Sequence, residues 1–179
     1  MAQHVSKPPV IPVPLITDTD SYLFKEGNHF KLYERLGSHL MTVDGVSGVH
    51  FAVWAPNAKS VSVIGNFNHW DRHTHPLNSR WDSSGVWEGF IPGIGKGELY
   101  KYFIISNNDY YQVEKQDPFA YYNEVPPRTG SVVWDLDYAW GDAAWMKDRH
   151  KVNNLNAPFS IYEMHLGSWK RVPEEGNRP

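Results

Sequence analysis

Apolar and polar residues alternate with a period of two through the central part of the chain, from about residue 41 to residue 134. In residues 48–70 the sequence GVHFAVWAPNAKSVSVIGNFNHW alternates, turns at Pro56-Asn57, alternates again and ends in a loop. Alternation of this kind places successive side chains on opposite faces of a β-strand. We therefore expect two strands that pair edge to edge, followed by a loop that presents aromatic and amide groups to solvent.

Further alternating segments follow at residues 86–91, 99–105, 110–114 and 131–134. Pro92 ends the first segment, and Asn107-Asn108-Asp109 is a turn signal between the second and third. Short strands separated by turns are typical of an all-β sandwich. The segment PGIGKG at residues 92–97 precedes a strand instead of a helix, so it lacks the geometry of a phosphate-binding loop and is predicted to be a hairpin turn.

The segment before the alternating region has a different pattern. The first 17 residues carry four prolines and predict an extended lead-in. Asp18 or Asp20 is placed to cap a short helix, and Leu32, Leu36 and Leu40 recur at helical spacing. We expect one or two short helices that lie against the following domain.

After residue 134 the alternation stops. Residues 135–149 mix aromatic and charged side chains, residues 153–158 form a linker, and residues 159–166 predict a final apolar strand for which the remaining sequence offers no partner. We therefore expect that the sequence is a fragment of a longer protein. The expected organisation is an N-terminal extension with short helices (1–40), a β-sandwich (41–134), a connector (135–158) and the first strand of a further domain (159–179).

The amino-acid composition and charge exclude several classes of function for this protein. The net charge is −3 with acids and bases interspersed, which offers nothing to neutralise a phosphate backbone, so nucleic acid is not an expected partner. There is no cysteine for a disulfide framework or a thiolate metal site. Without a long apolar run or a signal peptide, we expect no membrane partner and a cytoplasmic protein. Eight tryptophans in 179 residues favour either an aromatic core or a binding surface.

Two polar clusters contain residue types that can take part in metal binding or acid/base chemistry. His69, His73 and His75 gather around an aspartate, but all lie in one loop, whereas zinc sites usually draw ligands from two elements, so no metal is expected. Asp135 and Asp137 share one face of a predicted strand, yet no nearby residue would separate their pKa values as an acid/base pair requires. On its own residues the chain does not have a catalytic pattern, and no cofactor is expected.

A sugar-binding pattern stands out instead. Trp70 follows Asn66-Phe67-Asn68, Lys101 lies in the strand YKYF, and Tyr110-Tyr111 follow the next turn. Sugar rings have apolar faces and hydroxyl rims, so proteins bind them with flat aromatic rings and nearby hydrogen-bonding groups. The alternative is that Trp70 caps the core and that Lys101 belongs to an ordinary exposed face.

The segments FAVWAPNAKSVSVIGNFNHWD, HPL, GVWEGFIPGI, LYKYFI and DPFA resemble, in order, the starch- and glycogen-binding β-sandwich that precedes the catalytic barrel in many α-glucan enzymes. The flanking YLFKEGNHFKLYERLGSHL and SIYEMHLGSW extend the resemblance, over residues 18–169, to the 1,4-α-glucan (glycogen) branching enzyme family of the α-amylase superfamily. The resemblance implies a mainly β fold: an immunoglobulin-like β-sandwich carbohydrate-binding module with short N-terminal helices and the truncated start of a (β/α)8 barrel.

The resemblance also implies a function and its residues. The family transfers α-1,4-glucan segments to 6-hydroxyls by a retaining two-carboxylate mechanism, but its catalytic carboxylates have no matching positions here, so no catalytic residue is expected. The expected partners are α-1,4-glucan or glycogen and the chain's own catalytic barrel. The family's stacking tryptophan matches Trp70 and its lysine matches Lys101, with Asn68 beside them and Tyr110 or Tyr111 as a loose match. A regulatory glycogen-binding module, a debranching or trehalose-releasing relative, and a purely structural sandwich remain alternatives.

Overall fold

The structure is a computed structural model that describes residues 10–108, 110–152 and 154–178. Contacts divide the chain into two compact units, one up to Asp137 and one from Tyr138 onward, and each is described by itself. The beginning of the expected lead-in, residues 1–9, and Asp109 of the expected turn lie outside the described residues.

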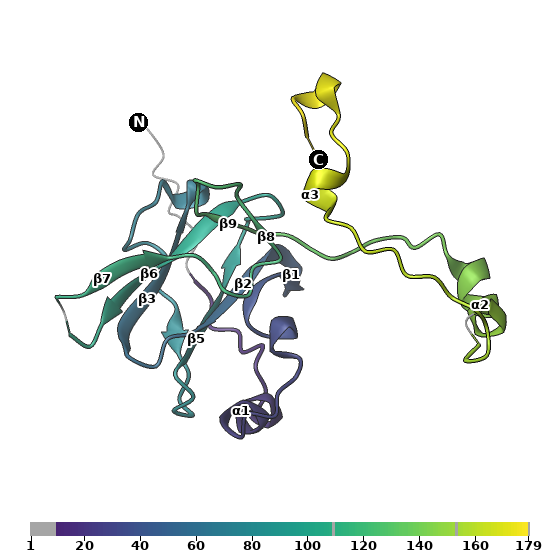
Figure 1. Cartoon of the computed structure of the whole chain (residues 1–179). Helices are drawn as coiled ribbons and strands as arrows, with labels where there is room; N and C mark the ends of the chain where they lie inside the picture. Colours follow the sequence, from purple (N-terminus) through teal and green to yellow (C-terminus); the bar gives the residue numbers. More distant parts are fainter. Residues whose placement is uncertain (1–9, 109, 153, 179) are drawn as a thin grey trace. The chain divides into compact units, whose positions relative to one another are not determined.

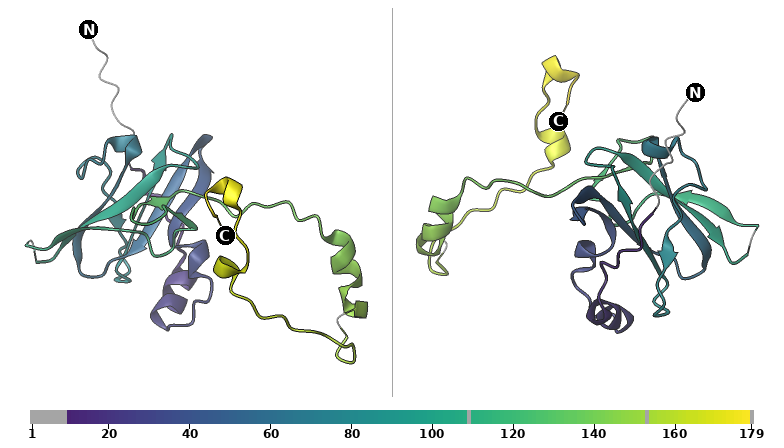
Figure 2. Two further views of the ribbon diagram at one scale, coloured as in Figure 1. Left: turned by 45° about the horizontal axis from the view of Figure 1, so that its top comes forward. Right: turned by 180° about the vertical axis from the view of Figure 1, so that it is seen from behind.

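The first unit contains two antiparallel sheets that face each other (Figure 1; Figure 2). Sheet A has the order β1-β2-β5-β4, formed by β1 (Gly37–Val43), β2 (Val46–Trp54), β5 (Val86–Pro92) and β4 (Asn78–Ser79). Sheet B has the order β3-β6-β9-β8 with β7 also paired to β6; its strands are β3 (Ala58–Gly65), β6 (Leu99–Ser106), β9 (Ser131–Val132), β8 (Tyr122–Asn123) and β7 (Gln112–Lys115). The predicted β-sandwich is confirmed.

The core lies between the two sheets and follows from the alternation in sequence. Every second residue of β2, β3 and β6 points inward, and these side chains form one buried cluster, which includes Val49, Phe51, Val53, Val61, Val63, Tyr100 and Tyr102. Each of these side chains contributes on the order of 1.5–3 kcal/mol by leaving water. The period-two pattern was therefore a reliable guide to the inner faces.

Two predictions about strand pairing were wrong. The strands on either side of Pro56-Asn57, β2 and β3, do not pair with each other: β2 pairs with β1 and β5, and β3 pairs with β6. The glycine-rich residues 92–97 likewise join β5 of sheet A to β6 of sheet B and form no hairpin. In both places the chain crosses from one sheet to the other, which lets two apolar faces close on each other. The β6–β7 connection is a true hairpin.

The outer face of sheet A is covered by the N-terminal segment. α1 (Asp18–Lys25) and η1 (Leu32–Glu34) precede β1, and Leu36, Ile16, Ala52 and Val86 form a second buried cluster that Phe24 and Leu32 flank. The expected short helices laid against the sandwich are thus present. Because Ala52 points away from the main core into this cluster, β2 is buried on both faces.

The details of these helices differ from the sequence prediction. Thr17 is the N-cap of α1, and Asp20 completes a capping box at N3, so neither aspartate is itself the cap. A helix does not run from Leu32 to Leu40: η1 ends at Glu34, and Leu40 lies in β1. Gly37, the first residue of β1, adopts φ +101°, a conformation that favours glycine.

The second unit contains α2 (Ala143–Val152), α3 (Leu166–Trp169) and the short η3 (Pro173–Glu175). The strand predicted over residues 159–166 is not formed: residues 159–165 have no regular structure, and α3 begins at Leu166. A strand needs a neighbour for its backbone N–H and C=O groups, and the described part of this unit provides none. Within the described ranges, no helix is both long and apolar enough to span a bilayer.

Candidate functional site

The loop after β3 is held by one buried amide side chain. η2 (Asn66–Asn68) starts the loop, and the Oδ1 of Asn68 accepts a hydrogen bond from Gly65 N at 2.9 Å. The Nδ2 of Asn68 donates to the carbonyl of Val63 at 3.0 Å and to His75 Nδ1 at 3.0 Å. Asn68 therefore ties both ends of the loop to β3 and is fully buried.

This burial corrects the prediction that Asn68 contacts a glucan. With its side chain closed inside the loop, Asn68 has no surface to offer a ligand. It is a positioning residue, because its hydrogen bonds set the path of the residues that follow. The sequence analysis named Asn68 as the contact residue, and only the fold shows that Asn68 faces inward while Asn66 is exposed.

Trp70 sits at the exposed end of this loop. His69 and Trp70 both have positive φ, 54° and 60°, which non-glycine residues seldom adopt. The conformation is held by a hydrogen bond from Trp70 N to Gly65 O at 2.9 Å, and the indole Nε1 donates to Asn66 Oδ1 at 3.0 Å. The indole is 37% exposed, so the backbone and Asn66 fix a flat aromatic ring at the surface. Asn66, which points outward, is the amide that orients it.

Lys101 lies at the same end of sheet B as Trp70. Ile64 pairs with Lys101 and Gly65 pairs with Tyr100 across the β3–β6 ladder, so the strand end that anchors Trp70 also carries Lys101. The Nζ of Lys101 donates to Thr129 Oγ1 at 2.8 Å, just before β9. Three elements thus bring an indole, an ammonium and a hydroxyl to one end of one sheet, as the sequence predicted for the first two.

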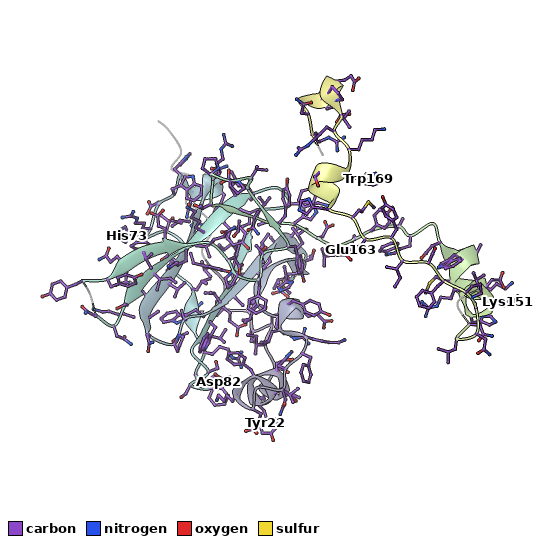
Figure 3. The ribbon with its side chains drawn as sticks, in the orientation of Figure 1. Tyr22, His73, Asp82, Lys151, Glu163 and Trp169 are labelled. Atoms are coloured by element: carbon purple, nitrogen blue, oxygen red, sulfur yellow. The ribbon has the colours of Figure 1, made fainter. Side chains whose placement is uncertain are left out.

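Arg72 is a neighbour that the sequence analysis missed. Its guanidinium lies 4.7 Å from the centroid of the Phe103 ring and forms an ion pair with Glu114 of β7 at 2.7 Å. These contacts spread the loop across the outer face of sheet B, where Figure 3 shows His73 of the same loop close to β7. No local sequence signal identified Arg72, because its partners come from β6 and β7.

Tyr110 and Tyr111 lie at the other end of β6. Both belong to the β6–β7 hairpin, where Tyr110 is 96% exposed and Tyr111 is also exposed. Lys101 is near the start of β6, and the strand runs on to Ser106, so the hairpin lies beyond roughly 17 Å of strand at ~3.3 Å per residue. The fold therefore does not bring the two tyrosines together with Trp70 and Lys101.

A buried polar group supports the site from inside the sandwich. Asp117 accepts hydrogen bonds from the hydroxyls of Tyr100 and Tyr102 at 2.7 and 3.0 Å, and its backbone N–H donates to Ser131 Oγ at 2.9 Å. Burial raises the pKa of Asp117, although these hydrogen bonds oppose the rise, and burial beside Asp117 also raises the pKa of Tyr100. The network fixes β9 against β6 and so positions the segment that carries Thr129.

The other polar clusters have structural partners. His75 is buried against Asn68 and in edge contact with Phe67, and no group of three or more potential metal-ligating side chains occurs within the described residues. Asp135 forms an ion pair with Lys96 at 2.9 Å, and this hydrogen bond lowers its pKa. A carboxylate held ionised in this way is a poor general acid.

Residues 35–120, the segment that contains both Trp70 and Lys101, match the carbohydrate-binding module 48 family, described as the isoamylase N-terminal domain. This match agrees with the β-sandwich fold of the structure, and residues 35–120 (the module 48 segment) provide the frame for the loop and strand just described.

The chain is also similar to named enzymes. The 1,4-alpha-glucan branching enzyme GlgB of Aquifex aeolicus (strain VF5) is 54% identical over 164 residues, which cover 92% of this chain and 26% of that protein. GlgB of Thermosynechococcus vestitus is 55% identical over 163 residues, or 90% of this chain and 21% of that protein. The predicted resemblance to branching enzymes is confirmed, and the chain spans about a quarter or less of the length of these relatives.

Among solved structures, the chain resembles a pullulanase of Klebsiella pneumoniae that was crystallised with maltotriose. The two are 28% identical, with a TM-score of 0.46, over 58% of this chain and 10% of that one.

Proposed function

We propose that this chain is the N-terminal, glucan-binding portion of a cytoplasmic 1,4-α-glucan branching enzyme. The similarity to GlgB supports this reading, because it covers about nine-tenths of the chain and extends beyond the module 48 segment on both sides. A regulatory module without an enzyme would have no need of these shared flanks. The same flanks favour a branching enzyme over a debranching or trehalose-releasing relative.

The module binds linear α-1,4-glucan at the Trp70 end of sheet B. The observation that carries this proposal is the surface indole of Trp70, fixed by Asn66 and by the backbone of Gly65 beside Lys101 and Thr129. A rigid ring stacks on the apolar face of a glucose unit, and the ammonium and hydroxyl reach its hydroxyl rim. Because the ring is held before the ligand arrives, little conformational entropy is lost on binding.

The branching reaction belongs to the longer protein. Such an enzyme would cut an α-1,4 bond and transfer the glucan to a 6-hydroxyl, with catalytic carboxylates outside this chain. Its catalytic barrel is the second expected partner, and residues 159–179 would form the start of it. The exposed apolar side chains of the second unit, which include Phe159, Ile161 and Tyr162, are suited to such a contact.

We further propose that the domains follow the expected division into an extension, a sandwich, a connector and a barrel start. The sandwich boundary moves slightly, from residue 41 to Gly37, because β1 starts there.

Affinity electrophoresis of the 179-residue chain in gels that contain glycogen tests the site. Trp70→Ala should weaken retention about tenfold, which corresponds to ~1.4 kcal/mol, while Tyr110→Ala, a matched aromatic truncation at the remote hairpin, should not. Equal retention of wild type and Trp70→Ala would show that glucan binds elsewhere or not at all, and a saturable fluorescence change with maltoheptaose would separate these two outcomes.

Incubation of the chain with amylose tests whether the 179-residue chain lacks branching activity, as proposed. Iodine absorbance should remain constant, because no catalytic pair is proposed here. A loss of absorbance through new branches would contradict the proposal.

A further inference from the structure

A second groove opens at sheet A, between the strap of residues 10–17 and the edge strand β4. Its volume is about 560 Å³, which is within the range of small-molecule sites. The strap contributes Pro12 and Pro14 to one wall, and β4 with the following turn contributes Asn78, Ser79 and Trp81 to the other. One wall is thus apolar, and the other offers an amide, a hydroxyl and an indole.

The groove is far from Trp70. Gly85, which ends the turn that carries Trp81, packs on Pro56 at the start of β3, whereas Trp70 is tied to Gly65 at its end. β3 runs from Ala58 to Gly65, so the two tryptophans are separated by roughly 20 Å of strand. They belong to opposite ends of the sandwich and cannot stack on the same sugar.

The guanidinium at the floor of the groove is already paired. Arg80, the cationic side chain among its lining residues, forms ion pairs with Asp82 at 2.9 Å and with Glu88 at 2.6 Å, and all three side chains are nearly buried. The second carboxylate oxygen of Glu88 accepts a hydrogen bond from Leu15 N at 3.1 Å. Since the guanidinium is committed to two carboxylates, an anionic ligand gains nothing here. The groove is suited to a neutral polar ligand.

Trp81 is presented on a rigid turn. Its side chain is 84% exposed. The turn is held by Asp82, which accepts hydrogen bonds from Ser84 N at 3.0 Å and from Arg80, and by Lys25 of α1, which donates to the Asp82 carbonyl. Figure 3 shows Asp82 beside α1, close to Tyr22. A single exposed tryptophan is common, but one on a braced turn at the rim of a polar groove is placed to stack on a ligand.

We propose that this groove is a second binding site for linear α-glucan, with Trp81 as its stacking platform and Asn78, Ser79 and Asp18 as hydrogen-bonding partners. A neutral ligand with apolar faces and hydroxyl rims matches the indole, the proline wall and a floor whose guanidinium is already paired. The choice of α-glucan rests on the proposed function of the module. Two sites at opposite ends of one sandwich let a single chain hold two glucan segments at once, which multiplies retention on a branched polymer.

An NMR titration of the 179-residue chain tests this proposal, because the indole N–H resonance of each tryptophan can be followed separately. Assignment uses Trp70→Phe and Trp81→Phe, and maltoheptaose is the titrant. Both the Trp70 and the Trp81 resonances should shift saturably, and the Trp81 shift should persist in Trp70→Ala. If Trp70 shifts and Trp81 does not, the second site is wrong and the proposed function stands. If neither shifts, both fail.

Retention on glycogen gels gives an independent check. Trp81→Ala should lower retention about threefold, and Trp70→Ala combined with Trp81→Ala should abolish it. Phe30→Ala, an equally exposed aromatic outside the groove, is the matched control and should behave as wild type. Wild-type retention of Trp81→Ala would overturn the inference.

Discussion

The two sheets of the sandwich share one core but differ on their outer faces. Part of the outer face of sheet A is covered by α1, η1 and the strap, which bury Ile16, Leu36 and Ala52. The outer face of sheet B is crossed by the loop after β3, which leaves Trp70 at the surface near Lys101. Sheet A therefore uses most of its outer face for stability, apart from the groove beside β4, whereas sheet B presents polar and aromatic groups on its outer face.

This difference separates a face that stabilises the fold from a face that presents an aromatic ring to solvent. Covering sheet A with the chain's own residues supplies buried apolar area, and sheet B is then free to keep an aromatic ring in water. The loop on sheet B costs backbone strain at His69 and Trp70, and buried hydrogen bonds of Asn68 offset it. Substitutions on the two outer faces should accordingly have different effects.

The largest effect on stability is expected for Leu36→Ala on the covered side. Leu36 is fully buried in the cluster outside sheet A, so its truncation should lower the free energy of unfolding by about 2–5 kcal/mol. Leu40→Ala in β1, where the side chain is exposed, is the matched control and should cost well under half as much. Urea unfolding measures both. Equal losses would show that the cover does not stabilise the sandwich.

A smaller effect, which depends on pH, is expected for Asp20→Asn. Burial raises the pKa of Asp20, but hydrogen bonds from Thr17, His29 and Arg35 outweigh it and lower the pKa well below its usual range. A depressed native pKa gives stability that is present above the unfolded value of about 3.9 and is lost as pH falls below it. At pH 7 the variant should lose ~1–3 kcal/mol.

The difference between wild type and Asp20→Asn should therefore shrink as the pH falls from about 5 to 3. Urea unfolding at several pH values measures it. The comparison removes the contributions of other carboxylates with lowered pKa, such as Asp82, because both proteins retain them. A difference that does not change with pH would contradict the proposed role of the carboxylate.

The smallest effect is expected for Lys101→Met on the open side. The change keeps an apolar stem and removes the ammonium that donates to Thr129, so stability should change by no more than about 0.5 kcal/mol. Retention on glycogen should fall about threefold, as expected for one hydrogen bond. Lys115→Met on β7 is the matched control. If the two variants bind equally, Lys101 is an ordinary surface residue.

Particular residues show how far the sequence predicted the fold. The inward faces of β2, β3 and β6 followed from alternation, because burial on one side of a strand requires it. Strand partners did not follow, since β2 and β3 are adjacent in sequence yet lie in different sheets. The strand predicted at residues 159–166 failed for a related reason, because an apolar run becomes a strand only beside a partner.

The candidate site likewise has features that the sequence predicted and features that only the fold decided. The sequence by itself determined that the chain is a β-sandwich with an aromatic and amide-bearing loop, because periodicity and residue type are local properties. Only the tertiary structure decided that Asn68 faces inward, that Arg72 reaches Glu114, and that Tyr110 lies at the wrong end of β6. Trp70 and Lys101 lie at the same end of sheet B because β3 pairs with β6, and hydrogen bonding between distant strands depends on the closed core of the whole sandwich.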